Sequence, residues 1–391
     1  MTITSPQGFV AAGVAAGLKS TGAKDVALVV NEGPLRVGAG VFTSNRVFAA
    51  PVAWSRQVIA DGRIDAVILN SGGANASTGP EGFADTHRTA EHVAEALQAA
   101  GRDISSGDVA VCSTGLIGVR LPMERLLSGV DAATATLAAD GGDDAAHAIM
   151  TTDSVAKQTL VERDGWSVGG MAKGAGMLAP GMATMLSVVT TDAVLTEAQA
   201  DAVLAEAVRT TFNRVDSDGC MSTNDTVLLL ASGASGVTPS LEDVQAAVTE
   251  ACAVLSRALV ADAEGASHDI AVTVVNATSE DAAEAVARAV TRSNLFKAAI
   301  FGKDPNWGRV IAAAGTVPED IAPYDANLMD VVINGVQVCR AAGVGDDRDL
   351  VDLEPREVRV EIDLHAGDAS ATVWTNDLTH DYVHENSAYS S

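Results

Sequence analysis

The sequence is poor in aromatic and basic residues. Phe, Trp and Tyr make up 4% of the 391 residues while the apolar fraction is 47%, so the core must be built from Ala, Val, Leu and Ile. Lys and Arg number 25 against 51 Asp and Glu, which gives a formal net charge of −26. Such an acidic surface repels phosphate backbones and argues against a nucleic-acid partner. A small anionic ligand is still compatible with it where a local cation such as Lys173 offsets the field.

Cysteine is scarce and irregularly spaced. The four cysteines contain no CxxC pair, which argues against a structural zinc site or a disulfide framework and is typical of a reducing compartment. Cys112 ends an apolar, strand-like run, and we interpret it as a core residue rather than a nucleophile. No HExxH pair occurs among the seven histidines, so no metal is expected. His380 and His384 are four residues apart, but the residues between them read as strand.

Long apolar runs and a targeting segment are also missing. No run approaches the roughly 20 apolar residues that cross a bilayer. The segment before Lys19 has no basic start, so it does not read as a signal peptide. We therefore expect a cytoplasmic location.

Length and periodicity predict an α/β protein with two lobes. A chain of 391 residues can bury a large core and is expected to form two lobes. Short apolar runs alternate with helical patterns, which is typical of α/β structure. Strands are predicted at residues 25–30, 65–70, 108–112, 186–189, 269–276, 329–336, 357–364 and 370–375. Helices are predicted at residues 81–100, 123–139, 196–211, 241–263 and 280–292, with Thr196 as a cap.

The most unusual segment is the Gly- and Pro-broken run at 171–186, which reads MAKGAGMLAPGMATML. Its methionines and leucines are too apolar for an ordinary surface loop, so we expect it to lie inside the protein. Near its end Ala183 precedes Thr184. A threonine there can attack the preceding carbonyl, break the chain and become an N-terminus with a hydroxyl nucleophile and an α-amino base. Such dipeptides are also common in plain loops, so the pattern alone leaves both interpretations open.

Other segments carry groups that an acyl-transfer enzyme needs. Residues 112–118, CSTGLIG, follow an apolar strand and can form a turn whose N–H groups face a developing oxyanion; a simple turn is the alternative. Lys173 is one of only six lysines and lies in the apolar run, which favours a pocket cation. Thr151, Thr152 and Asp153 place two hydroxyls beside a carboxylate. Glu264 precedes a glycine at the end of a predicted helix, where an exposed glutamate is the commoner case.

Two glycine-containing segments lack nucleotide-binding spacing. Residues 302–309, GKDPNWGR, do not match GxxxxGK[ST], which argues against a nucleoside triphosphate site. Asp304, Pro305 and Asn306 instead predict a turn and a helix start. Residues 70–76, NSGGANA, are not GxGxxG, and we interpret their amide side chains as lining a polar pocket.

Taken together, these segments resemble one family, the ornithine acetyltransferases of arginine biosynthesis, also called glutamate N-acetyltransferases. The matching pieces follow one another along nearly the whole chain, and their combination is far more specific than any single piece. They are residues 112–118, 149–153, 173–177 continuing through 183–186, 222–226, 304–309 and 386–391.

The resemblance implies a chain that cuts itself between Ala183 and Thr184, giving an α chain (1–183) and a β chain (184–391) in an α2β2 heterotetramer. It implies a two-lobed α/β sandwich that resembles N-terminal nucleophile hydrolases but has distinct connectivity. By the same carry-over Thr184 is the nucleophile that becomes acetylated, and Thr114 with Gly115 forms the oxyanion hole. The implied substrate-contacting positions are Thr152, Lys173, Thr184, Glu264, Asn386 and Ser391.

The implied reaction moves an acetyl group from N2-acetylornithine to glutamate by a ping-pong mechanism. No cofactor is implied, and whether acetyl-CoA is also a donor stays open. The chain departs from the family where Ser390-Ser391 replaces the Thr-Thr of many relatives, and where Ala266-Ser267-His268 replaces Ala-Thr-Lys. Two alternatives are an N-terminal nucleophile amidase or aminopeptidase, and a non-catalytic small-molecule binding protein with an intact chain.

Overall fold

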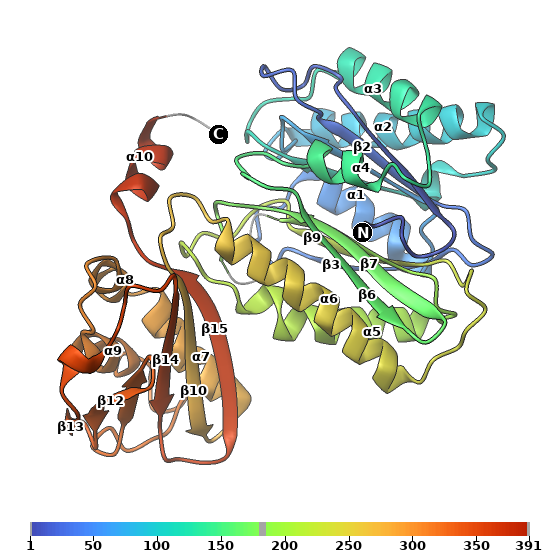
Figure 1. Cartoon of the computed structure of the whole chain (residues 1–391). Helices are drawn as coiled ribbons and strands as arrows, with labels where there is room; N and C mark the ends of the chain where they lie inside the picture. Colours follow the sequence, from blue (N-terminus) through green and yellow to red (C-terminus); the bar gives the residue numbers. More distant parts are fainter. Residues whose placement is uncertain (1, 180–184, 389–391) are drawn as a thin grey trace. The chain divides into compact units, whose positions relative to one another are not determined.

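The structure is a computed structural model that describes residues 2–179 and 185–388 (Figure 1). The predicted cleavage site Ala183-Thr184 and the predicted contact Ser391 lie outside the described residues. The chain forms two compact units, which agrees with the two predicted lobes. The first comprises Met1–Asn213 with Cys220–Leu259, and the second Arg214–Gly219 with Val260–Ser390.

The first unit contains two sheets. The four-stranded sheet has the order β1-β2-β4-β5 and the five-stranded sheet the order β3-β9-β8-β7-β6. The strands of the former are β1 (Phe9–Val14), β2 (Val26–Asn31), β4 (Ala66–Ser71) and β5 (Val109–Thr114). Those of the latter are β3 (Val37–Phe42), β6 (Lys157–Arg163), β7 (Trp166–Lys173), β8 (Leu186–Thr191) and β9 (Thr226–Ala231).

The two sheets pack face to face and share one core. Successive strand residues point to opposite faces, so each sheet sends every second apolar side chain to the other. Val29, Leu69 and Cys112 of the first sheet thus share a buried cluster with Val188 and Leu228 of the second. The interpretation of Cys112 as a core residue is confirmed, and burial raises the pKa of its thiol to about 12.

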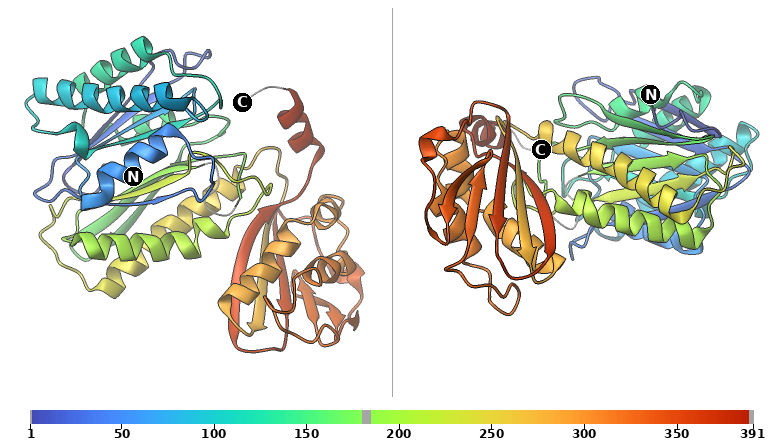
Figure 2. Two further views of the ribbon diagram at one scale, coloured as in Figure 1. Left: turned by 180° about the vertical axis from the view of Figure 1, so that it is seen from behind. Right: turned by 60° about the horizontal axis from the view of Figure 1, so that its bottom comes forward.

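Helices cover the two outer faces, which completes an α/β sandwich (Figures 1 and 2). The helices over the four-stranded sheet are α1 (Ala50–Val58), α2 (Gly79–Ala99) and α3 (Met123–Ala135). Those over the five-stranded sheet are α5 (Glu197–Thr210) and α6 (Leu241–Ala261). The short α4 (Gly142–Ala148) packs on β1. Thr196 caps α5 in a full capping box with Gln199, as the sequence predicts for this residue. The α/β prediction is therefore confirmed.

The helix α6 is long and apolar enough to cross a membrane by length and composition. It has 21 residues with a mean hydropathy of 1.4, so the expectation that no such segment exists is wrong by this measure. Half of that window is buried, and Leu255 contacts the sheet at Gly170. A core helix passes the same test, so this single helix is weak evidence for a membrane span.

The predicted cleavage boundary falls inside the five-stranded sheet. β8 pairs antiparallel with β7, which precedes the boundary, and parallel with β9. The two compact units consequently do not follow the predicted α and β chains, because both predicted chains contribute strands to one sheet. Cleavage itself stays a prediction, and a cut there would leave two interlocked chains.

The second unit is a six-stranded sheet with the order β13-β12-β11-β14-β10-β15. Its strands are β10 (Asp269–Ala277), β11 (Asp330–Ile333), β12 (Val336–Arg340), β13 (Gly343–Val344), β14 (Glu357–Asp363) and β15 (Ala369–Asn376). The helices α7 (Glu280–Thr291), α8 (Asn294–Phe301) and α9 (Trp307–Ala314) contribute apolar residues to its core. The helix start predicted at Asn306 is confirmed, since its side chain caps α9.

Two elements of this unit differ from the sequence-based predictions. The single strand expected at 329–336 is a hairpin of β11 and β12, because Asn334 and Gly335 both have positive φ and form the turn. The strand read between His380 and His384 is the helix α10 (His380–Ala388). Its polar sequence buries no side chain, so no apolar period marks it in the sequence.

Candidate active site

The predicted oxyanion turn lies at the end of β5. Thr114 is 3% exposed, and its carbonyl accepts hydrogen bonds from the N–H groups of Gly72 and Gly73, each at 3.0 Å. Gly115 follows with φ of 127°, a conformation open mainly to glycine. A Cβ on Gly115 would lie 2.6 Å from the Gly73 nitrogen. The backbone of the 72–74 segment therefore fixes the shape of this turn.

Asn224 holds the same turn from the other side. Its side-chain amide donates to the carbonyl of Ser113 at 2.8 Å and to that of Ala74 at 2.6 Å. Asn70 adds a further tie, since it donates to Gly73 and accepts from Ser113. The amides of the 70–76 segment thus support the backbone, whereas the sequence suggested that they line a pocket.

Lys173 is the cation nearest to this turn in the recorded contacts. It ends β7, is 1% exposed, and its Nζ donates to Oγ1 of Thr114 at 3.2 Å. The structure therefore joins two residues that the sequence placed in the site separately. The described part of the 171–186 run is also largely buried, as predicted: Ala175, Leu178 and Met185 are each at most 3% exposed.

A buried carboxylate, Asp153, stands behind Lys173. Its Oδ1 accepts from Lys157 Nζ and from the N–H of Gly174, each at 2.6 Å, and its Oδ2 accepts from the N–H of Thr151 at 2.9 Å. Burial alone would raise the pKa of this carboxyl, but the charges of Lys173 and Lys157 and the hydrogen bonds outweigh it and hold the pKa at about 2. Asp153 is therefore ionised at neutral pH and fixes the backbone next to Lys173.

Thr152, a predicted substrate contact, is exposed beside this network between Thr151 and Asp153. The sequence drew attention to this run of hydroxyls and carboxylate but gave Asp153 no role and missed Lys157. The available signal was the lysine four residues after the aspartate, a spacing too common to stand out.

A second buried carboxyl lies next to the end of the unusual run. Oδ1 of Asp225 accepts from the N–H of Met185 at 3.0 Å, and Met185 follows Thr184 in the chain. Within residues 2–179 and 185–388 its Oδ2 has no hydrogen-bond partner. Burial raises the pKa of Asp225 well above its usual value. The sequence matched the segment 222–226 without assigning a role to Asp225.

Two other predicted contacts meet in the second unit. The side-chain amide of Asn386, on α10, donates to Oε2 of Glu264 at 3.1 Å. Glu264 also lines a small cavity of about 50 Å³ together with the buried Lys297. Burial lowers the pKa of Lys297, and nearby aspartates partly oppose this. The predicted contacts thus form two groups: Thr114, Gly115, Thr152 and Lys173 in the first unit, Glu264 and Asn386 in the second.

The departure at Ser267-His268 is used inside the second unit. His268 is 5% exposed, with Nδ1 at 2.8 Å from Asp377 Oδ2 and Nε2 at 3.2 Å from the carbonyl of Leu353. The histidine therefore supports the loop after α6. In the described part of the chain no three His, Cys, Asp or Glu residues gather as metal ligands.

The Asp153 network gives a testable stability prediction. The pKa of about 2 lies below the model value of 3.8, so the ionised carboxylate adds about 2 kcal/mol of stability above pH 4 that is lost as the pH falls toward 2. Asp153→Asn should lower the free energy of unfolding by about 3–5 kcal/mol at pH 7, because it leaves the buried Lys157 without its counter-ion. Urea unfolding at pH 7 and between pH 5 and 3 measures this.

The matched control is Asp144→Asn. Asp144 also pairs with a lysine, Lys24, but its side chain is 56% exposed, so the change should cost little. The interpretation fails if the two variants lose equal stability, or if the deficit of Asp153→Asn does not shrink as the pH falls.

Comparison with known proteins identifies the family. The model of the ArgJ family matches residues 10–391. The arginine biosynthesis bifunctional protein ArgJ of Streptomyces coelicolor is 61% identical, covering 100% of both chains. A solved ornithine acetyltransferase chain from Mycobacterium tuberculosis, complexed with ornithine, is 60% identical with a TM-score of 0.46 and covers 47% of this chain and 96% of its own. An ArgJ chain from Bacillus halodurans is 32% identical with a TM-score of 0.49 and covers 52% and 98%. This chain therefore belongs to the ArgJ family and is an enzyme of arginine biosynthesis.

Proposed function

We propose that this enzyme transfers the acetyl group of N2-acetylornithine to glutamate through an acetyl ester on Thr184. The contact between Lys173 and Thr114 at the glycine-shaped turn carries the proposal. It places a buried cation and the end of a rigid strand beside each other, as an acyl-transfer site requires. Membership of the ArgJ family supports the substrate class.

The first half-reaction acetylates the enzyme. The α-amine of Thr184 takes the proton of its own hydroxyl, and Oγ1 attacks the acetyl carbonyl carbon. The N–H of Gly115 and the Thr114 side chain stabilise the oxyanion, with the Lys173 charge beside them. The C–N bond then breaks, the amine of ornithine takes the proton, and ornithine leaves.

The second half-reaction restores the threonine. The α-amine of glutamate attacks the acetyl ester, the same groups stabilise the oxyanion, and the C–O bond breaks. The proton of the attacking amine returns to Thr184, and N-acetylglutamate leaves. The turn serves both halves because both tetrahedral intermediates carry the negative charge on the same acetyl oxygen.

Self-cleavage supplies the α-amine that this mechanism needs. Oγ1 of Thr184 attacks the carbonyl of Ala183, and hydrolysis of the resulting ester releases the new N-terminus. The described residues on the C-terminal side support this, since Met185 is held by Asp225 and leads directly into β8. The enzyme then consists of the chains 1–183 and 184–391, assembled as an α2β2 heterotetramer in the cytoplasm, without a cofactor.

The decisive test separates donor and acceptor. Purified enzyme is incubated with N2-acetylornithine alone, with acetyl-CoA alone, and with each donor plus glutamate, and the mass of the β chain and the products are recorded. We expect an acetyl mass on the chain that begins with Thr184, and N-acetylglutamate only when glutamate is present. Acetate released at the same rate without glutamate would support the amidase alternative, and acetyl-CoA-dependent product would add the second donor.

A further inference from the structure

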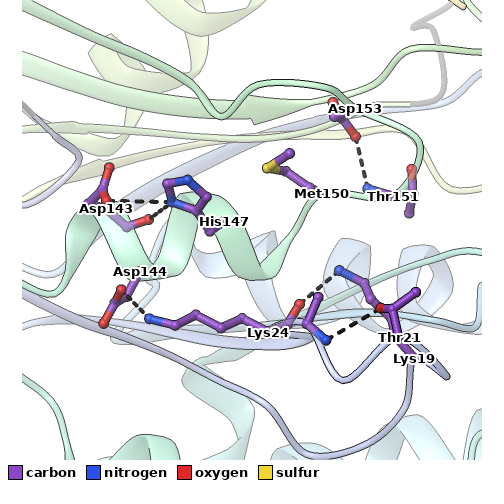
Figure 3. Close-up of a pocket in the computed structure, with 10 residues that line it drawn as sticks. Lys19, Thr21, Lys24, Asp143, Asp144, His147, Met150, Thr151 and Asp153 are labelled. Carbon is purple, nitrogen blue, oxygen red and sulfur yellow. Dashed lines mark hydrogen bonds and ion pairs between the residues drawn. The ribbon is translucent and has the colours of Figure 1, made fainter.

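A cavity of about 570 Å³ opens in the first unit beside the Asp153 network (Figure 3). One wall is the loop between β1 and β2, which carries Lys19 and Lys24. The opposite wall is α4 and the residues after it, with Asp143, Asp144 and Asp153. Both signs of charge therefore line one cavity, which is unusual in a protein with so few lysines.

The lysine-bearing wall is held rigidly by a buried carboxylate. Asp25 is 0% exposed and accepts from the backbone N–H groups of Ala16 and Leu18 at 2.6 Å each and of Lys19 at 3.0 Å. Lys19 Nζ in turn donates to the carbonyl of Lys24 at 2.8 Å. An ammonium has three N–H donors, so this contact orients the group without using its full capacity.

The acidic wall is positioned by close packing of α4 on β1. A Cβ on Gly13 of β1 would lie 1.9 Å from the carbonyl oxygen of Asp144, so only glycine allows this approach. Asp144 pairs with Lys24 across the cavity, and Asp143 lies within 3.5 Å of His147. The carboxylates of Asp143 and Asp144 are 61% and 56% exposed, so they stand at the mouth of the cavity.

The inner end of the cavity adjoins the proposed reaction centre. Asp153 lines the cavity and accepts from the N–H of Gly174, the residue after Lys173. Burial, and the charge of Lys173, lower the pKa of Lys19, and Asp25 and Asp153 oppose this only in part. A carboxylate bound near Lys19 would relieve both effects.

We infer that this cavity binds the side chains of both amino-acid substrates. The inference rests on the proposed function. N2-acetylornithine and glutamate share an α-carboxylate and the nitrogen that exchanges the acetyl group, but one side chain ends in an ammonium and the other in a carboxylate. A single ping-pong site must accept both in turn. Lys19 binds the glutamate carboxylate, and Asp143 with Asp144 binds the ornithine ammonium.

Crossed substitutions test this assignment. Lys19→Met should lower kcat/KM for glutamate about 10- to 100-fold, the effect of a lost charged hydrogen bond, and change kcat/KM for N2-acetylornithine by less than about 3-fold. The double variant Asp143→Asn, Asp144→Asn should show the opposite pattern. Lys19→Arg should recover much of the activity with glutamate. Lys303→Met, an exposed lysine of the second unit, is the matched control and should change neither value.

The outcomes separate this inference from the proposed function. If wild-type enzyme does not transfer acetyl from N2-acetylornithine to glutamate, the proposed function falls and the inference falls with it. If transfer occurs but each variant changes both kcat/KM values equally, or changes neither, the function stands and the subsite assignment is wrong. Opposite changes in the two variants support the assignment.

Discussion

Thr184→Ala should yield a single uncut chain that transfers no acetyl group. The substitution removes the hydroxyl that attacks the carbonyl of Ala183 and that later carries the acetyl ester. We expect cleavage to be undetectable and turnover to fall by at least about 10⁴-fold, as for the loss of other catalytic nucleophiles. Denaturing electrophoresis and intact mass measure the cleavage, and N-acetylglutamate formation measures the turnover.

Thr184→Ser is the matched control for that experiment. Serine keeps the hydroxyl but lacks the β-methyl group that restricts χ1, so both steps should persist at reduced rates. A Thr184→Ala enzyme that still cuts itself, or still acquires an acetyl mass, would refute Thr184 as the nucleophile. An uncut but fully active wild-type enzyme would refute the need for a new N-terminus.

Much of the fold is readable from the sequence where local signals are strong. β2, β4 and β5 are short apolar runs, and the Thr196 capping box marks the start of α5. The errors occur where local signals conflict with the tertiary structure. The Asn334-Gly335 turn divides an apolar stretch that reads as one strand, and α10 is polar all round.

The candidate site is less readable, because its contacts join distant segments. Lys173 meets Thr114 only because β7 and β5 end together in two different sheets, and no spacing rule links residues 59 apart. The roles of Asn224 and Asp225 depend in the same way on the loop before β9. The resemblance supplied the site residues themselves, whereas the structure supplies the network of Asp153 and Lys157 that supports them.

Gly115→Ala should abolish most of the acetyl transfer while leaving the rest of the fold in place. At φ of 127° an L-residue is strained, and the new Cβ would lie 2.6 Å from the Gly73 nitrogen and 2.9 Å from the Gly72 carbonyl carbon. That backbone cannot yield cheaply, because its N–H groups hold the Thr114 carbonyl. The turn must therefore move, and the Gly115 N–H moves with it.

The expected loss in kcat is about 10²–10³-fold, equal to 2.7–4 kcal/mol, the effect of removing one oxyanion donor. The value is expressed per mole of cleaved chain, so that slower self-cleavage does not count as slower transfer. Gly118→Ala is the matched control in the same loop: its φ is 84°, but its Cβ meets nothing within 4 Å. It carries backbone strain without the collision and should keep most of its kcat. Equal kcat losses in the two variants would assign the effect to strain and remove the Gly115 N–H from the oxyanion hole.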